Sequence, residues 1–264
     1  MSFVLNNMIF DRTVGATVSQ NGKVKAWLSQ LSNISFSTSA DPIEITDAMG
    51  NVVYRKYNAK NLEITATNAF ISTDIIALTS GTDMLYATEE MPLRFPKIEE
   101  VKVGTELEVS GLVEGTLEVY GLTASGAMST AVFSATASEA DHQFSVSADN
   151  KLTLPTYTDG GNIVKFLVKY TRDVNSGMMA KNYGDRFSKT SELVFKCLAV
   201  DPCDQKLRAC YIVVDSASIS PDVEIAIANG ESNTIDFNAQ ALLNMCAEDK
   251  TLFYIAFAEE DEEE

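Results

Sequence analysis

The sequence of 264 residues predicts a mainly β protein with one or two short helices and a small inserted β module. Two observations favour this class. Apolar and polar residues alternate with a period of two in one segment after another, which is typical of strands with one buried face. Between residues 97 and 155 the expected strands shorten and glycines separate them, which indicates a small β unit within the main fold.

The N-terminal part begins with a short apolar segment, 3–10, and an alternating strand over 24–38. A hairpin is expected over Ile43–Lys56, with its tip at Ala48, Met49, Gly50 and Asn51. Gly and Asn tolerate the positive φ of tight turns. The arms carry apolar and charged residues on both faces, so we expect the hairpin to project and to need a covering partner.

An alternating strand over 62–66 is followed by a helix from Ser72 or Thr73 to Ser80. Either residue can cap the helix start, Asp74 suits its positive end and Gly81 suits its termination. Short strands are then expected within the inserted module, at 106–109, 116–120 and 143–146.

Strong strands return in the C-terminal part, at 163–170, 191–200, 206–214, 223–227 and 251–257. A second helix is expected over 238–247, because its apolar residues follow the i, i+3, i+4, i+7, i+8 pattern. The resulting organisation is a discontinuous main β domain, the inserted module and an acidic tail expected to be disordered. These parts are assigned to residues 1–96 with 156–258, 97–155 and 259–264 respectively.

The formal net charge is −17, and the last six residues are all acidic. This balance argues against ordinary binding to a phosphate backbone, which requires clustered Lys and Arg. It suits a merely soluble acidic protein, and it also suits a surface past which nucleic acid slides without sticking. No secretory signal and no apolar stretch of about 20 residues is present, so no membrane segment is expected.

Residues for chemistry are few. The chain has one histidine, His142, in a polar stretch, which predicts a surface position. Its paired carboxylates are typical of a solvated acidic face, and Asp201-Pro202 predicts a turn. Cys197, Cys210 and Cys246 lie in apolar runs and are expected to be buried, whereas a Cys203 disulfide to a neighbour stays open. We therefore expect no catalytic, cofactor-binding or metal-binding residues, no cofactor and no enzymatic activity.

The order of these segments resembles that of bacteriophage major tail tube proteins. The stretch from Asp47-Ala48-Met49-Gly50-Asn51 to Asn61-Leu62-Glu63-Ile64-Thr65-Ala66-Thr67-Asn68-Ala69-Phe70 is the most suggestive part. The resemblance covers about two-thirds of the chain and omits residues 97–155. It consists of diffuse patterns, and other phage structural roles (head decoration or tail terminator) and a non-viral β-rich binding or adhesion module stay as alternatives.

The resemblance implies a tail-tube-like β-sandwich or half-barrel that forms homo-hexameric rings. Stacked rings would form a tube in a virion tail, assembled in the cytoplasm of the bacterial host, with the other tail proteins as further partners. DNA would pass through during genome ejection without specific binding, and no membrane would be involved. Residues 97–155 would then decorate the outside of the tube.

Two expectations about surfaces follow. The hairpin tip Ala48, Met49, Gly50 and Asn51 should contact other subunits. Strands that line a lumen should carry more Asp and Glu than Lys and Arg, and Glu44, Glu63 and Glu192 are candidates, although a period of two equally allows the opposite orientation.

Overall fold

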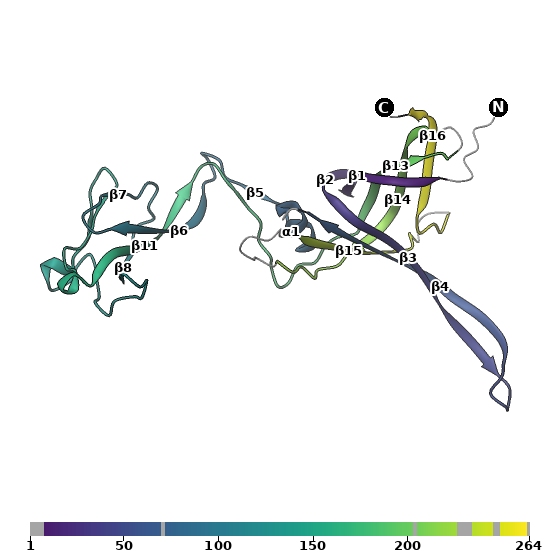
Figure 1. The fold of residues 1–264 in the computed structure, drawn as a ribbon, viewed down its shortest axis with the longest axis horizontal. Helices are drawn as coiled ribbons and strands as arrows, with labels where there is room; N and C mark the ends of the chain where they lie inside the picture. The colour runs from purple at the N-terminus through teal and green to yellow at the C-terminus, as the bar shows by residue number, and fades with distance from the viewer. Residues whose placement is uncertain (1–7, 70–71, 203–204, 226–233, 245–248, 263–264) are drawn as a thin grey trace. The chain divides into compact units, whose positions relative to one another are not determined.

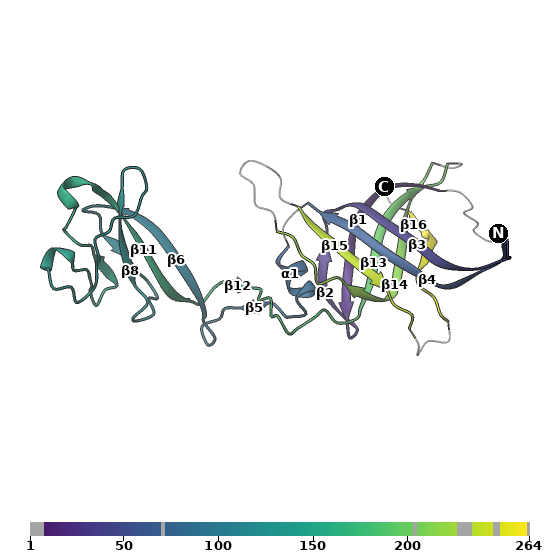
Figure 2. The same ribbon diagram turned by 90° about the horizontal axis from the view of Figure 1, so that it is seen from below.

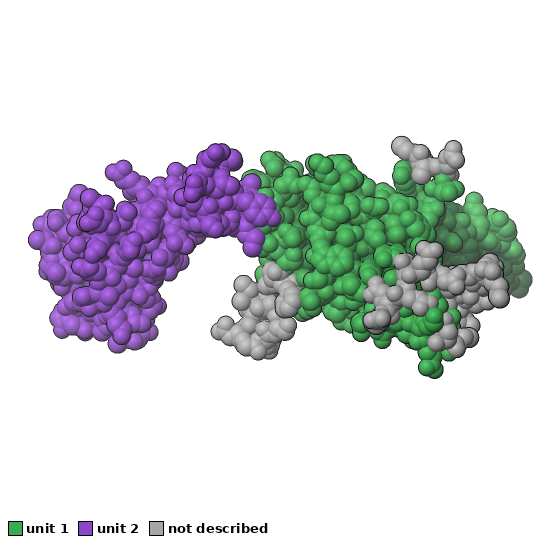
Figure 3. Space-filling model, turned by 90° about the horizontal axis from the view of Figure 1, so that it is seen from above, with its two compact units in different colours: residues 1–84, 180–264 green, residues 85–179 purple. Residues whose placement is uncertain are grey.

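The structure, a computed structural model, describes residues 8–69, 72–202, 205–225, 234–244 and 249–262. The chain divides into two compact units (Figure 3). Unit 1 comprises Met1–Met84 with Ala180–Glu264, and unit 2 comprises Leu85–Met179. Strands make up 55% of the residues and helix 6%, which confirms the predicted mainly β class. The segment 97–155 lies inside unit 2, which begins earlier in the sequence, at Leu85, and ends later, at Met179.

Unit 1 is built on one antiparallel sheet with the strand order β2-β1-β13-β14-β15-β4-β3, and β16 pairs with β14 (Figure 1). Its strands are β1 (Ile9–Gln20), β2 (Lys23–Leu28), β3 (Leu31–Thr46), β4 (Val52–Asn68), β13 (Ser191–Val200), β14 (Leu207–Ile219), β15 (Ile235–Ala241) and β16 (Tyr254–Glu262). Pairs far apart in sequence, such as β1 with β13 and β4 with β15, hold the sheet together. Both ends of the chain therefore contribute to one core.

The sheet of unit 1 curls over its own buried face, so that β3 and β4 pass across β13 and β14 (Figure 2). The ring of Phe36 on β3 meets that of Phe195 on β13 edge-on, with 5.1 Å between centroids. The one α-helix among the described residues, α1 (Thr73–Thr79), adds Ile75 and Leu78 to this core. Each large apolar side chain buried there stabilises the fold by about 1.5–3 kcal/mol. The helix confirms the prediction for this segment.

The prediction of one continuous strand over 24–38 is wrong. The structure breaks it between β2 and β3, because β2 pairs with β1 while β3 pairs with β4. The β1–β2 hairpin turns at Asn21 and Gly22, with φ of 52° and 71°. An Asn-Gly pair with positive φ at both residues is the preferred two-residue hairpin turn, so this turn had a readable signal.

The helix expected over 238–247 is wrong as well. Residues Ile235–Ala241 form strand β15, in which burial alternates strictly from one residue to the next. Ile235, Phe237 and Ala239 face the core, and the strand is held by β4 on one side and β14 on the other. The helical spacing of apolar residues was therefore overridden by long-range pairing. Residues 245–248 lie outside the described part of the chain.

Two further C-terminal expectations differ from the structure. Residues 223–225 are not in a strand, and 226–227 lie outside the described residues. Strand β16 reaches Glu262 and therefore includes residues 259–262, which were expected to be disordered. Its backbone pairs with β14, with Glu262 opposite Arg208. Backbone pairing to a neighbouring strand does not require an apolar side chain, which explains the difference.

Unit 2 has its own sheets and its own core. Two three-stranded sheets have the orders β6-β11-β8 and β7-β10-β9, and β5 pairs with β12. The strands are β5 (Leu85–Tyr86), β6 (Leu93–Lys102), β7 (Leu107–Glu108), β8 (Glu118–Thr123), β9 (Ser145–Val146), β10 (Lys151–Thr153), β11 (Ile163–Val174) and β12 (Met178–Met179). Phe166, Val168 and Tyr170 on β11 are fully buried in this core.

Candidate functional site

Strands β3 and β4 continue beyond the core of unit 1 as a two-stranded arm, residues 41–60 (Figure 1). All residues from 41 to 60 are exposed. The register runs from Pro42 opposite Tyr57 to Thr46 opposite Val52. The hairpin predicted from the sequence is therefore present, and the arm pairs with no third strand within the described residues.

The arm carries more apolar surface than a solvated hairpin needs. Tyr54 and Val53 are 56% and 62% exposed, and the tip residue Met49 is 87% exposed. The exposed large apolar residues of the arm are Ile43, Ile45, Met49, Val52, Val53, Tyr54 and Tyr57. A two-stranded hairpin is marginal by itself, and contiguous exposed apolar residues mark contact surfaces. The arm is thus the strongest candidate surface of unit 1 for contact with another chain.

The tip of the arm is closed by Asp47. Its carboxylate Oδ1 accepts hydrogen bonds from the backbone N–H groups of Met49 (2.9 Å) and Asn51 (2.8 Å). The side-chain amide of Asn51 donates to Oδ2 at 3.1 Å, and Gly50 has φ +85°. These bonds, above all that from the Asn51 backbone, lower the pKa of Asp47. The predicted contact residues Ala48–Asn51 therefore form an ordered, exposed turn.

A second feature of unit 1 is the solvent face of β3, β4 and β15. In register across this face lie Ser37, Glu63 and Gln240, and beside them Ser35, Thr65 and Asn238. Asp236 accepts a hydrogen bond from Thr67 at 3.0 Å on the same face. The strand segments 31–39, 61–68 and 235–241 contain no Lys or Arg. The face is therefore polar, with Glu63 and Asp236 as its charges.

The three carboxylates named from the sequence have different surroundings. Glu63 lies in the centre of this polar face. Glu44 lies on the arm and forms an ion pair with Arg55, its partner across the hairpin, so its charge is balanced. Glu192 is exposed on β13. Among these three, the structure places only Glu63 on the polar face.

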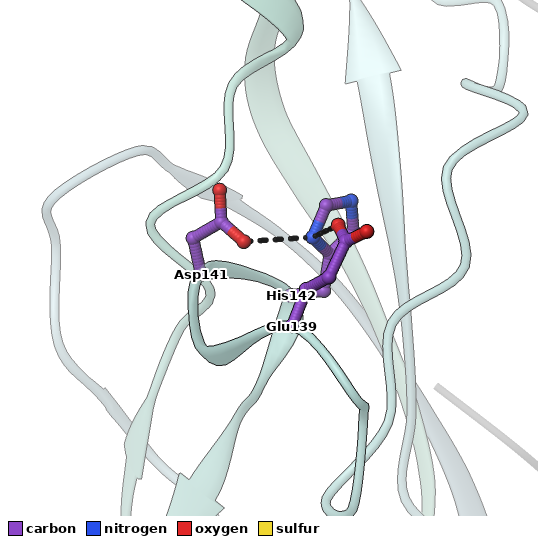
Figure 4. Close-up of side chains that lie close together, drawn as sticks. All are labelled: Glu139, Asp141 and His142. Atoms are coloured by element: carbon purple, nitrogen blue, oxygen red, sulfur yellow. Dashed lines mark hydrogen bonds and ion pairs between the residues drawn. The ribbon is translucent and has the colours of Figure 1, made fainter.

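His142 is partly covered, and its ring lies beside the carboxylates of Glu139 and Asp141 (Figure 4). Its side chain is 14% exposed, and its ring stacks on Tyr157 with 4.0 Å between centroids. The short 3₁₀ turn Ala140–His142 (η1) positions the ring. Nδ1 lies 2.9 Å from both Asp141 Oδ1 and Glu139 Oε2. His142 therefore lies at the surface of unit 2 with its ring partly covered, and the covering aromatic ring comes from residue 157, outside the turn.

Glu139, Asp141 and His142 are the side chains that could hold a divalent cation within the described residues. Imidazole and carboxylate are common ligands of zinc. The same geometry is satisfied without a cation, because a protonated Nδ1 can donate to the two carboxylates. Carboxylates nearby raise the pKa of Tyr157, with Asp159 having the largest effect. Hydrogen bonds within the cluster therefore explain its geometry without a metal ion.

Cys197 and Cys210 lie opposite each other on β13 and β14, and both are buried free thiols, as predicted. Burial raises the pKa of both, and that of Cys210 reaches about 12. Thiols that stay protonated are poor nucleophiles, so this pair is structural. Cys203 and Cys246 lie outside the described part of the chain.

A sequence model of the YomU/Tube protein family matches residues 12–255. No protein among the curated sequences matches the chain. The family match spans most of both units, from β1 into β16. In the described part of the chain, no helix is long and apolar enough to cross a membrane.

Proposed function

The chain belongs to the YomU/Tube protein family, which makes it a structural protein of a phage tail, and we propose that its copies form stacked rings that conduct DNA. A structural family fits the expectation that the chain is not an enzyme. The exposed apolar arm is the observation that carries the proposal. A monomer would hold this surface in water, whereas an assembly covers it.

We assign the arm, including Ala48, Met49, Gly50 and Asn51, to contacts between subunits. Paired apolar residues such as Ile45 and Tyr54 supply the buried area, and the closed tip supplies a defined shape. Ordering the tip before association reduces the entropy lost on binding. The arm then joins subunits without refolding.

The end strands of the sheet support ring formation. β2 and β3 are the two ends of the strand order in unit 1. An open strand edge pairs readily with another chain, and identical subunits around a rotation axis can use such edges to close a ring. Six copies per ring, as the family resemblance implies, are part of this proposal.

For the lumen, we propose the polar face of β3, β4 and β15. It presents Glu63 and Asp236 and no basic residue from these strand segments. Like charge prevents adhesion of DNA within a Debye length of about 8 Å at physiological salt. Serine, threonine and amide side chains add a hydrated surface without cationic anchors. Such a wall lets DNA pass without specific binding during genome ejection.

Electron microscopy of the purified protein tests the assembly. We expect tubes or rings of constant diameter from the parent chain and none from the double variant Ile45→Ser, Tyr54→Ser, which keeps the hairpin but removes its apolar surface. Ile98→Ser in unit 2 is the matched control, since Ile98 is 63% exposed and lies on β6. It should assemble normally. Tubes of normal yield from the double variant would contradict the role of the arm.

The same tubes test the conduit. Replacing Glu63 and Asp236 by Lys should make assembled tubes retain short DNA fragments in a salt-sensitive manner, because cations release counterions from the phosphates. Glu106 and Asp149 of unit 2, changed to Lys, give the control with the same change in net charge. Equal DNA retention by both variants would show that the polar face does not line the path of DNA.

A further inference from the structure

Unit 2 contains an apolar groove of about 670 Å³. It lies between strand β8 and the extended segment 128–135, within a single unit. The buried side chains of Val119, Phe133 and Phe144 form its base, and Val132 is 80% exposed at its rim. This volume lies in the range of specific binding sites.

One wall of the groove is the edge of strand β8, which is paired with residues 127–129 at Gly121 and Thr123 and is open at Val119. β8 is the last strand in the order β6-β11-β8. The carbonyl of Gly121 faces away from β11, because it accepts a hydrogen bond from Ser129 N–H at 2.8 Å. In a strand, residues two apart direct their backbone groups to the same side, so Val119 also faces the groove. Among the described residues, no backbone group from outside the sheet bonds to Val119.

The opposite wall has free backbone groups as well. The segment is anchored at Ser129, as above, and at Ser134, which donates to the His142 carbonyl at 3.4 Å. Between these anchors, the Ala131 N–H donates a hydrogen bond to Ser129 Oγ at 3.2 Å, and the described residues 130–133 make no backbone–backbone hydrogen bond. The groove is therefore an apolar slot with unpaired peptide groups on both sides, which an added strand satisfies.

The acidic residues of the groove indicate the charge of the segment that would bind there. Its lining contains Glu114 and Glu118 and no Lys, Arg or His. Glu118 is paired with Lys169 at 3.2 Å, whereas Glu114 is exposed. An acidic segment is disfavoured by this rim, and residues 259–262 of the acidic tail already belong to β16, which pairs with β14. A segment with basic residues gains charge complementarity.

We propose that this groove binds an extended segment of another protein by strand addition to β8. The segment has small or branched apolar side chains that enter the slot, and Lys or Arg beside Glu114. Main-chain hydrogen bonds to Val119 supply affinity, and the apolar base selects alternate side chains. This inference is independent of the assembly proposal, because it concerns a surface of unit 2 alone.

The test is selection of random nonapeptides on the full-length protein, followed by fluorescence anisotropy with the selected synthetic peptides. We expect peptides that alternate apolar residues with Lys or Arg. Glu114→Lys should weaken their binding about five- to tenfold at low salt. Asp149→Lys is the matched control, an exposed acid of unit 2 outside the groove, and should bind as the parent does.

A second variant tests the strand edge. Val119→Pro removes the N–H that faces the groove and leaves the β11 side of the ladder without a lost donor. Binding should be lost while the thermal transition persists; should this variant fail to fold, Glu114→Lys decides alone. The proposal is overturned if no peptide exceeds background, if the selected peptides are acidic, or if Glu114→Lys binds them unchanged. Binding that disappears when the chain self-associates would identify a second copy as the occupant and also overturn it.

Discussion

Asp47 is the residue that gives the exposed arm a defined end. Its carboxylate accepts hydrogen bonds from Met49 and Asn51. These bonds satisfy backbone N–H groups of the turn that have no partner strand. The bonds favour the ionised form, so the pKa of Asp47 is lowered. A group with a lowered folded pKa contributes order that is present above its unfolded value of roughly 3.9 and is lost as pH falls through the folded pKa.

We therefore predict that the amide protons of Met49 and Asn51 are protected from exchange, relative to their intrinsic rates, at neutral pH, and that this protection is lost only as the pH falls through the lowered pKa of Asp47. In Asp47→Ala these two amides should lack that protection at every pH, because the acceptor is gone. Asp41→Ala changes another exposed acid of the same arm and serves as the control. Hydrogen exchange measured by NMR checks this. Slow exchange in Asp47→Ala would show that another group closes the tip.

At the scale of elements, β15 shows how partners decide between helix and strand. Its sequence satisfies helical spacing when read onward to residue 247, and strand spacing when read from Ile235. β4 and β14 offer edges on both sides, and the strand buries Phe237 between them. Burial of alternate residues outweighs the helical pattern, in which Leu242 and Leu243 are 39% and 40% exposed.

Paired substitutions in β15 test this assignment. Phe237→Ala should lower the free energy of unfolding by about 3–5 kcal/mol, because it leaves a cavity in the core of unit 1. Its neighbour Asn238 has an exposed side chain, and Asn238→Ala should change stability by less than about 0.5 kcal/mol. Chemical denaturation measures both. Comparable losses at the two positions would contradict a strand with one buried face.

At the scale of the molecule, the two units have separate cores joined by two crossings of the chain. Leu85 and Met179 lie opposite each other in the β5–β12 pair, so the crossings run side by side. Cα atoms of such partners are about 4.5–5.5 Å apart. We propose that unit 2 is an insertion that decorates the outside of the tube, whose removal leaves unit 1 complete.

Excision of residues 85–179 with a two-residue glycine linker from Met84 to Ala180 should therefore yield a folded unit 1 that still assembles. Excision of 97–155, the boundaries taken from the sequence, is the comparison. It removes β8 and part of β6 and exposes Phe166, Val168 and Tyr170 on β11, so we expect aggregation. Calorimetry and microscopy distinguish the two outcomes. Unfolding of the first variant would show that unit 2 is required by the core of unit 1.

The sequence by itself determined the features that depend on near neighbours. Alternation of side chains predicted most strands, Gly50 and Asn51 predicted the hairpin turn, and the residues around Thr73–Thr79 predicted the helix. Each is a local property, since a turn or a cap needs only a few consecutive residues. The order of these local elements was also sufficient for the family resemblance, which the match over 12–255 confirms.

Only the tertiary structure decided what depends on distant partners. The break between β2 and β3, the strand at β15, the stacking of His142 on Tyr157 and the outer limits of unit 2 all follow from pairing across many residues. Strands β6 and β11 illustrate the reason. Their apolar and polar residues would alternate in the same way in a sheet of either unit, and only their pairing with each other places both in unit 2. A period of two shows that one face is buried, and the partner that buries it is chosen by the free energy of the whole sheet.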